Sequence, residues 1–187
     1  MESKVKESDK RYFIAIVPPP PVYDQVQELK YFFRDNYHTT AALNSPPHIT
    51  LHMPFEWSER KESILCDKLE VFFAAMKGFH LQLLNFSCFA PKTIFIHVAK
   101  TKELEKLENE LHRFCKKEFN LFNARYKDLP FHPHLTVAFR DMSKTTFAEA
   151  WKEFSNKKFS SDFYVDKIVL LKHNGKIWEP LRDFLLN

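Results

Sequence analysis

The chain has 187 residues, a formal net charge of +4 and 16% aromatic side chains, with phenylalanine supplying 20 residues. This length suits one domain that buries its own core, and the aromatic content excludes a largely disordered chain. The two glycines, Gly78 and Gly175, exclude a P-loop and a dinucleotide-binding fingerprint, because both motifs need several clustered glycines. The modest charge permits a phosphate-bearing partner without requiring one.

The first half of the chain begins with a polar stretch, and β-forming and helix-forming segments then alternate. Four consecutive prolines, Pro18 to Pro21, end the first strand, and Pro46 and Pro47 introduce the second. The predicted elements are a flexible tail over residues 1–10, a strand over 11–17, a helix over 22–37, a strand from His48 to about residue 55, a helix from an N-cap at Ser58 to Gly78, and a strand over 79–89.

A similar series then follows. The predicted elements are a strand over 93–98, a helix over 102–119, a loop through 128–130, a strand over 134–140, a helix from an N-cap at Ser143, and a strand over 163–171. Asn174-Gly175 predicts the turn of a terminal hairpin. The order strand, helix, strand, helix, strand occurs twice, which indicates an internal duplication.

This duplication predicts an α+β, bilobal fold in which two antiparallel sheets face a central cleft and the helices lie outside. We expect residues 11–187 to form one domain, with lobes of roughly 11–90, completed by the C-terminal hairpin, and 91–187. No segment is apolar for long enough to cross a bilayer, and no signal-peptide core is present. We therefore expect a cytoplasmic protein without a membrane partner, and we expect a monomer.

Two short segments carry the same pattern, Pro-His-apolar-Thr-apolar. They are Pro47–Leu51 and Pro133–Val137. Because side chains alternate along a strand, the histidine and threonine of each segment share one face. The pattern predicts a site built from His48, Thr50, His134 and Thr136.

Two imidazoles and two hydroxyls are suited to displacement at phosphorus. An imidazole titrates near neutrality, so one histidine accepts a proton while the other donates one. Each threonine hydroxyl donates a hydrogen bond to a phosphate oxygen. This chemistry needs no metal and no cofactor, because side chains handle both protons.

The paired motifs resemble those of the 2H phosphoesterase superfamily, close to its 2'-5' RNA ligase or RNA 2',3'-cyclic phosphodiesterase group. His48-Ile49-Thr50-Leu51 and His134-Leu135-Thr136-Val137 match its two motifs, and residues 129–134 resemble the approach to the second. The resemblance implies an enzyme that opens cyclic phosphates or 2'-5' linkages of RNA or nucleotides. It implies that His48 and His134 are catalytic, with Thr50 and Thr136 on the phosphate.

Other interpretations stay open. The protein is alternatively an RNA end-joining ligase that uses the same site, or a binding module that holds RNA or a nucleotide without turnover. A zinc hydrolase built on His132 and His134 is a third alternative, since two histidines on one strand face can bind zinc. Arg140 follows the second motif, but a one-residue shift on a strand reverses the face, so it receives no role.

Several further side chains are weaker candidates for the site. His52 shares the face of His48 and Thr50 if that strand is regular, and His97 is a candidate for the same cleft. Aromatic rings are candidates for stacking a base, and loop lysines for attracting phosphate. These residues are Phe89, Phe131, Tyr126, Tyr164, Lys92 and Lys127.

Overall fold

The structure, a computed structural model, describes residues 9–122 and 130–187. The strands are β1 (Asp9–Ile16), β2 (Ile49–Ser58), β3 (Phe79–Phe89), β4 (Thr93–Val98), β5 (His134–Phe139), β6 (Ser160–Val165), β7 (Lys167–His173) and β8 (Trp178–Leu185). The helices are α1 (Val22–Tyr37), α2 (Glu62–Ala74), α3 (Lys102–Phe119) and α4 (Lys144–Phe154), with short 3-10 helices η1 (Ala41–Asn44) and η2 (Glu59–Lys61).

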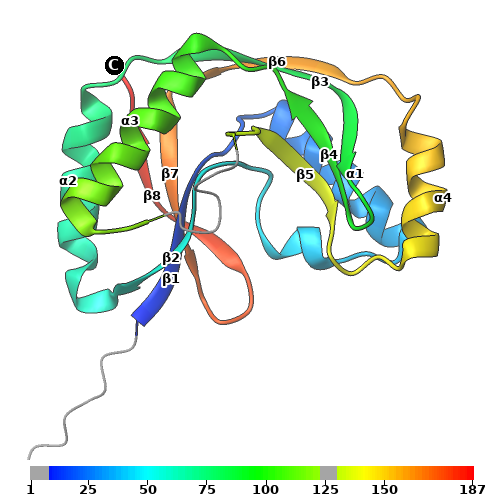
Figure 1. Cartoon of the computed structure of the whole chain (residues 1–187), viewed down its shortest axis with the longest axis horizontal. Helices are drawn as coiled ribbons and strands as arrows, with labels where there is room; N and C mark the ends of the chain where they lie inside the picture. Colours follow the sequence, from blue (N-terminus) through cyan, green and yellow to red (C-terminus); the bar gives the residue numbers. More distant parts are fainter. Residues whose placement is uncertain (1–8, 123–129) are drawn as a thin grey trace, which may run out of the picture.

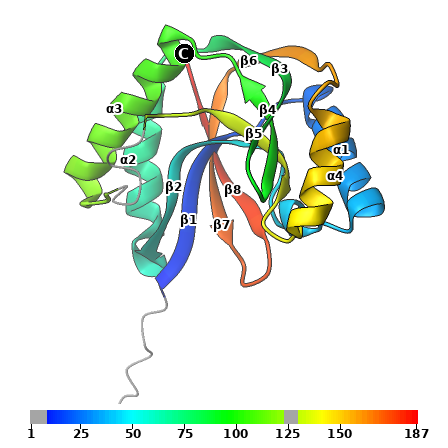
Figure 2. The ribbon, with the colours of Figure 1, turned by 45° about the vertical axis from the view of Figure 1, so that its right-hand side comes forward.

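The described strands join in one antiparallel sheet of order β6-β3-β4-β5-β2-β1-β7-β8. Extended ladders hold β6-β3-β4-β5 together and β2-β1-β7-β8 together. Between these halves, β2 and β5 share one residue pair, Ile49 with Leu135. The sequence predicted two sheets, and the structure instead has a single curled sheet, because this pair links them. Figures 1 and 2 show the halves on opposite sides of the molecule.

The two halves are interleaved along the chain. β3, which the sequence placed in the first lobe, pairs with β4 and β6. β7 pairs with β1, and β8 pairs with β7. The boundary expected near residue 90 therefore does not separate the strand groups. The physical reason is local, since β3 and β4 are joined by a short turn and neighbours of this kind usually form a hairpin.

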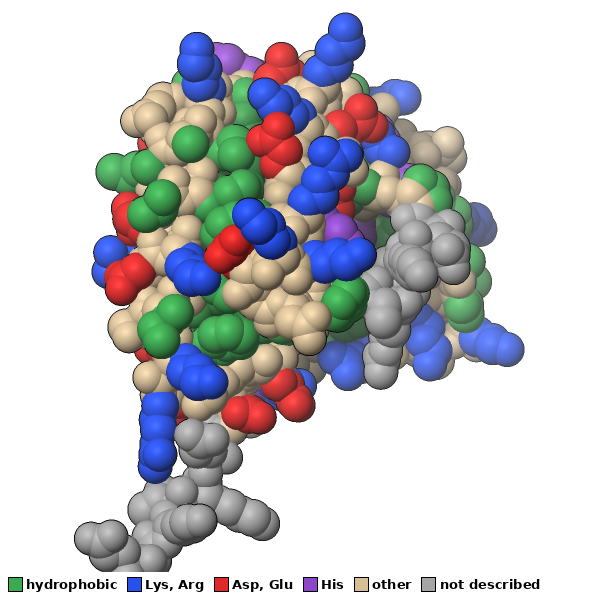
Figure 3. Space-filling view, turned by 60° about the vertical axis from the view of Figure 1, so that its left-hand side comes forward, with side chains coloured by type: hydrophobic (Ala, Val, Ile, Leu, Met, Phe, Trp, Pro, Cys, Tyr) green, Lys and Arg blue, Asp and Glu red, His purple; other side chains and the backbone are tan. Residues whose placement is uncertain are grey.

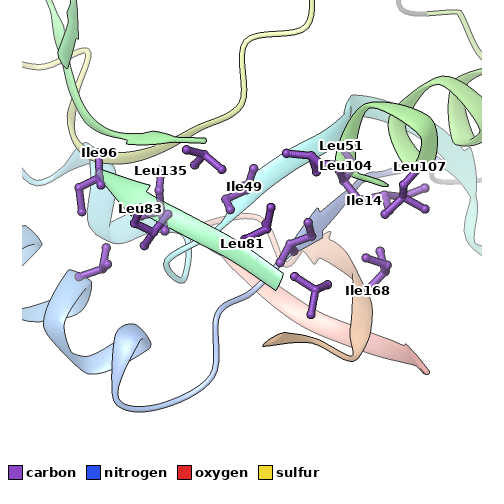
Figure 4. Close-up of a cluster of buried hydrophobic side chains, with 14 of the residues drawn as sticks. Ile14, Ile49, Leu51, Leu81, Leu83, Ile96, Leu104, Leu107, Leu135 and Ile168 are labelled. Carbon is purple, nitrogen blue, oxygen red and sulfur yellow. The ribbon is translucent and has the colours of Figure 1, made fainter. Parts of the chain in front are cut away.

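The helices cover one face of the sheet, which we call the helix face. α1 packs on β5 and β6, α2 on β8, and α3 on β2, so each half has helices beside it (Figure 1). α4 joins α1 through Phe154, whose ring centroid lies 4.5 Å from that of Phe33. Figure 4 shows apolar side chains of several strands and of α3 gathered in the resulting core, among them Ile14, Ile49, Leu81, Leu104 and Leu135.

The N-cap predicted for α4 is confirmed, whereas the N-cap predicted for α2 is wrong. α4 begins as expected, because Ser143 Oγ accepts a hydrogen bond from the Thr146 N–H at 3.0 Å. α2 begins later than predicted. Ser58 still belongs to β2 and caps nothing with its side chain, and η2 intervenes before the helix starts at Glu62.

Gly78 does not end α2, which stops at Ala74. The Gly78 N–H instead donates to the Asn187 carbonyl at 2.9 Å. A side chain at this position would collide with the ring and hydroxyl of Tyr164 on β6. A side chain at position 78 would therefore need the exposed Tyr164 ring to move.

The outer surface over α2 and α3 is charged. Figure 3 shows Lys and Arg side chains interspersed there with Asp and Glu. Pairs such as Lys68 with Glu118, at 2.8 Å, connect the two helices. This is the pattern of a solvated face. Among the described residues, no helix combines the length and apolar composition that a bilayer crossing needs.

Candidate active site

The two motif segments meet where the halves of the sheet join. Ile49 and Leu135 are the paired residues, and both are fully buried on the helix face. Extending the antiparallel register by one residue in each direction sets His48 opposite Thr136, and Thr50 opposite His134. The structure therefore brings the four predicted site residues together, as two crossed pairs related by the duplication.

All four side chains lie on the side of the sheet opposite the helices, which we call the motif face. The alternation of the strands sends the intervening residues Ile49 and Leu135 into the helix-side core. On the neighbouring strands, Ala15 pairs with Thr50, and Phe95 pairs with Thr136. Each of the four motif side chains is half-buried, so each is held in place yet keeps some exposure.

The same irregularity follows both motifs. In β2 the partner register jumps from Thr50 to His52, and in β5 it jumps from Thr136 to Ala138. Each jump is a β-bulge, which accommodates one extra residue and redirects the strand. The duplication therefore extends to backbone detail immediately after each threonine.

The bulge corrects the prediction for His52. A regular strand would place this ring on the motif face, but His52 pairs with Ile14 and lies 2% exposed on the helix side. Its ring centroid is 6.4 Å from that of His112 on α3 and 5.4 Å from that of Phe55. His52 therefore does not line the candidate site.

Each motif histidine is oriented by a carbonyl two residues upstream. His48 Nδ1 lies 2.8 Å from the Pro46 oxygen, and His134 Nδ1 lies 2.7 Å from the His132 oxygen. A carbonyl oxygen only accepts, so the proton of each neutral ring sits on Nδ1. This leaves Nε2 of both histidines unprotonated in the neutral state, so that this atom can accept a proton.

Aromatic rings support both imidazoles from neighbouring strands. The Phe13 ring on β1 lies 4.9 Å from His48 and is itself packed edge-on by Trp178 at 4.7 Å. The Phe95 ring on β4 lies 5.1 Å from His134. None of these three rings was among the site residues predicted from the sequence. The sequence could have indicated Phe95, because strand alternation places it on the face opposite the core residues Ile94 and Ile96.

The surroundings disfavour the charged form of both histidines. Burial lowers the pKa of His48 to about 4, and the charges of Lys30 and then His134 act in the same direction, against the Pro46 hydrogen bond. Burial also lowers the pKa of His134, where the His132 carbonyl opposes it and the His132 charge adds to it. The two imidazoles are close enough for one charge to affect the other, as a shared site requires.

His97 and His132 also lie near the second motif. His97 pairs with His134 across β4 and β5, which places it on the motif face. The His132 ring centroid lies 6.3 Å from that of His134 and 6.1 Å from that of His97. Even so, the described residues contain no group of three or more His, Cys, Asp or Glu side chains placed to hold a metal ion.

The weaker candidates are scattered. Phe89, 42% exposed at the end of β3, has its ring 5.2 Å from His134. Phe131 packs partly against the core, and Tyr164 on the edge strand β6 packs edge-on against His80. Lys92 is exposed in the β3–β4 turn. The remaining two, Tyr126 and Lys127, lie outside the described residues, as does Leu129 of the approach to the second motif.

Two surface cavities lie away from the motifs. One of about 400 Å³ is lined by α1, β3 and the end of α4, and one of about 260 Å³ by the β7–β8 hairpin and Glu59. Neither is lined by a motif residue.

Comparison with known proteins gives a consistent picture. The family model described as "2'-5' RNA ligase superfamily" matches residues 18–177, a span that includes both motifs. A protein of Oceanobacillus iheyensis, named a "Putative phosphoesterase", is 29% identical over 182 residues, covering 94% of this chain and 98% of that protein. A protein of Geobacillus kaustophilus with the same description is 28% identical over 180 residues, covering 94% and 96%.

Two solved structures are similar over nearly the whole chain. LigT of E. coli, crystallised with 3'-AMP, has a TM-score of 0.68 at 22% identity, covering 96% of this chain and 99% of that one. TT0787 of Thermus thermophilus has a TM-score of 0.68 at 18% identity, covering 94% and 97%. At these identities the likeness concerns the fold, a mixed α/β arrangement around a curled antiparallel sheet.

Proposed function

Because the chain belongs to the 2'-5' RNA ligase superfamily, we propose that it is a phosphodiesterase that hydrolyses 2',3'-cyclic phosphates or 2'-5' linkages of RNA or nucleotides. The family resemblance predicted from the motifs is confirmed, and the names of its relatives support a phosphoesterase. In this proposal His48 and His134 are catalytic, and Thr50 and Thr136 bind the phosphate.

One observation carries the proposal. The Ile49–Leu135 pair brings two histidines to one point on one face, and both have Nδ1 held by a carbonyl and Nε2 left for proton exchange. A pair of this kind provides one proton acceptor and one proton donor around a single reacting group. The pKa of each histidine is lowered from its ordinary value, which favours the acceptor.

The reaction on a cyclic phosphate balances with one water. The neutral histidine takes a proton from water at Nε2 while the water oxygen forms a bond to phosphorus. The bond from phosphorus to one ribose oxygen breaks, and the protonated histidine donates its Nε2 proton to that oxygen. The Thr50 and Thr136 hydroxyls donate to the phosphate oxygens, where charge develops in the transition state.

A nucleotide is the simplest substrate for this site. LigT of E. coli has been crystallised with 3'-AMP, a ribonucleotide phosphate. Phe89 adds an exposed ring beside His134, suited to stacking a base. End joining by the reverse reaction uses the same four side chains, and a binding module would keep them without turnover.

The proposal is tested by incubating the purified protein with 2',3'-cyclic mononucleotides and with short RNAs that carry cyclic or 2'-5' ends, in excess chelator. We expect turnover to a phosphomonoester, with His48→Ala and His134→Ala each lowering kcat by a factor of about 10² to 10⁴. His80→Ala, an exposed histidine on β3, is the matched control.

The alternatives give different results. A binding module protects the cyclic end from an added phosphodiesterase and consumes none of it. A ligase joins RNA ends under the same conditions. A zinc hydrolase loses activity in the chelator and regains it with zinc. Full activity in either histidine variant would contradict the proposed roles.

A further inference from the structure

Lys30 is a buried cation in the middle of α1. Its side chain is 2% exposed, in the stripe that also buries Val26 and Phe33. Its Nζ donates to the Ala42 carbonyl at 3.0 Å and to the Ser45 carbonyl at 2.9 Å. Among the described residues no carboxylate forms an ion pair with it. A buried ammonium held only by carbonyls destabilises a fold unless other interactions compensate, so its position calls for an explanation.

The acceptors of Lys30 belong to the segment that delivers the first motif. Ala42 lies in η1 and Ser45 follows it directly. The next carbonyl, that of Pro46, accepts the Nδ1–H of His48. Lys30 and His48 therefore hold successive carbonyls of one backbone segment, so a shift of that segment also moves the acceptor of His48.

Asp141 fixes the other end of the same turn. This residue follows β5, and its carboxylate accepts from the Thr39 hydroxyl and from the N–H groups of Thr40 and Ala41, the latter two at 2.7 and 3.0 Å. The turn η1 thus has an anion at its N–H end and a cation at its carbonyl end, the arrangement that its peptide dipoles favour. A residue just after β5, the strand of the second motif, thereby anchors the approach to the first.

This device breaks the symmetry of the two motifs. The helix that precedes the second motif, α3, buries Leu104, Leu107, Leu111, Cys115 and Phe119. These are all apolar, so α3 places no cation at a buried position comparable to that of Lys30. The two histidines are equivalent in hydrogen bonding but differ in their electrostatic surroundings.

We infer that Lys30 is a positioning residue which anchors the segment that orients His48 and, through its charge, makes His48 the proton acceptor of the pair. This inference rests on the proposed function, because the roles of proton acceptor and proton donor belong to the proposed hydrolysis. With His48 as the acceptor, His134 donates a proton to the leaving oxygen. It gives each of the two related histidines its own part in hydrolysis.

The charges around His48 set a pH window. In the described chain the titratable groups that act on His48 are Lys30 from α1 and His134 from β5, while Phe13 of β1 adds an uncharged ring. Burial lowers the pKa of Lys30 to about 7, and that of His48 is about 4. Between these values Lys30 is charged and His48 is neutral, so the acceptor remains available in mildly acidic solution.

The experiment follows the titration of His48 by NMR in the full-length protein and in three variants. Lys30→Met removes the charge and both hydrogen bonds of Nζ, while the side chain keeps a similar size. Lys30→Gln keeps an N–H donor and removes the charge. Lys106→Met, on the exposed surface of α3, is the matched control. The pH profile of kcat/KM is measured alongside on a 2',3'-cyclic mononucleotide.

We expect the His48 midpoint to rise from about 4 toward 6.5 in Lys30→Met and Lys30→Gln, and to stay in place in Lys106→Met. The His48 midpoint should remain below 6.5 in both variants, because burial lowers this pKa more than the charge of Lys30 does. The acid limb of kcat/KM moves up with it, and kcat/KM falls about tenfold for each pH unit by which the pKa exceeds the assay pH. Lys30→Met also weakens the anchor, so its KM changes more than that of Lys30→Gln.

An unchanged His48 midpoint in both Lys30 variants overturns the inference. If neither variant folds, the wild-type protein alone still tests the inference. Its His48 ring signals must shift a second time near pH 7, as Lys30 loses its proton. Absence of that second step contradicts the inference. Failure of the proposed function is a separate result, since an inactive wild-type protein leaves the His48 titration fully measurable.

Discussion

Ile49 and Leu135 form the residue pair through which the two halves of the sheet meet, and each lies directly between a motif histidine and a motif threonine. Both side chains are fully buried on the helix face. The contact that joins the halves thus also fixes how the side chains of the two motifs are placed relative to each other on the opposite face. The buried contact and the candidate site therefore lie on opposite faces of the same two strands.

This arrangement predicts that Ile49→Ala and Leu135→Ala damage both stability and turnover. Each substitution should lower the free energy of unfolding by about 2–5 kcal/mol, through lost burial and the cavity left behind. Urea denaturation measures this effect. Because the two side chains are neighbours, the double variant should depart from additivity by about 0.5–3 kcal/mol. Leu185→Ala, at an exposed position of β8, is the control and should change stability by less than about 0.5 kcal/mol.

The threonines should affect phosphate binding without affecting the fold. Thr50→Val and Thr136→Val keep the shape and remove the hydroxyl. We expect each to lower kcat/KM by a factor of about 10 to 100, since a hydrogen bond to a charged group contributes about 1.5–3 kcal/mol. Thr145→Val, at an exposed position of α4, should have no effect. Wild-type kcat/KM in both motif variants would remove the threonines from the site.

Lys30 should also give the stability of the protein a distinctive pH dependence. Its pKa is about 7 in the folded chain, against 10.5 as the ordinary value. Between these values the unfolded chain binds the extra proton, so the contribution of Lys30 to stability is lost as the pH falls from 10.5 to 7 and gained as it rises. The difference in unfolding free energy between wild type and Lys30→Met should change over this range by at most about 5 kcal/mol.

Chemical denaturation of both proteins at several values between about pH 6 and 10 measures this difference. Comparing the two removes the effects of other groups, such as Lys172 and Tyr12, because they are present in both. A difference that stays constant with pH would show that Lys30 keeps an ordinary titration in the folded protein.

Asp141 should stabilise the turn before the first motif. Asp141→Ala leaves the Thr40 and Ala41 N–H groups to water, at a cost of about 0.5–1.5 kcal/mol for each lost hydrogen bond, because both bonds are exposed. We expect a lower melting temperature and faster amide exchange in residues 39–45. Asp183→Ala, which removes an exposed partner of Lys167, is the matched control and should leave the exchange of this turn unchanged.

The same carboxylate should respond to acid. Burial raises the pKa of Asp141, but the hydrogen bonds from Thr39, Thr40 and Ala41 outweigh it and the net pKa is lowered. Its contribution is therefore complete above the ordinary value of 3.8 and is lost as the pH falls below it. Acid unfolding should begin at a higher pH in Asp141→Asn than in wild type. Coincident acid transitions would contradict this account.

The sequence determined those features that depend on short-range geometry. Alternation along a strand is a property of the backbone itself, so the spacing of His48 and Thr50, and of His134 and Thr136, predicted correctly that each pair shares one face. Ser143 was identified as an N-cap for the same reason, since a cap is made within one turn of helix. The two motifs also carried the family resemblance that the comparisons confirm.

Only the tertiary structure decided which segments meet and how. The Ile49–Leu135 pair depends on strands far apart in sequence, and the bulge that turns His52 to the helix side depends on its register with Ile14. Lys30 was not predicted from the sequence, because its partners lie in a turn whose position other elements fix. Local patterns assign a side chain to a face, whereas the contacts of that face arise from packing between distant parts of the chain.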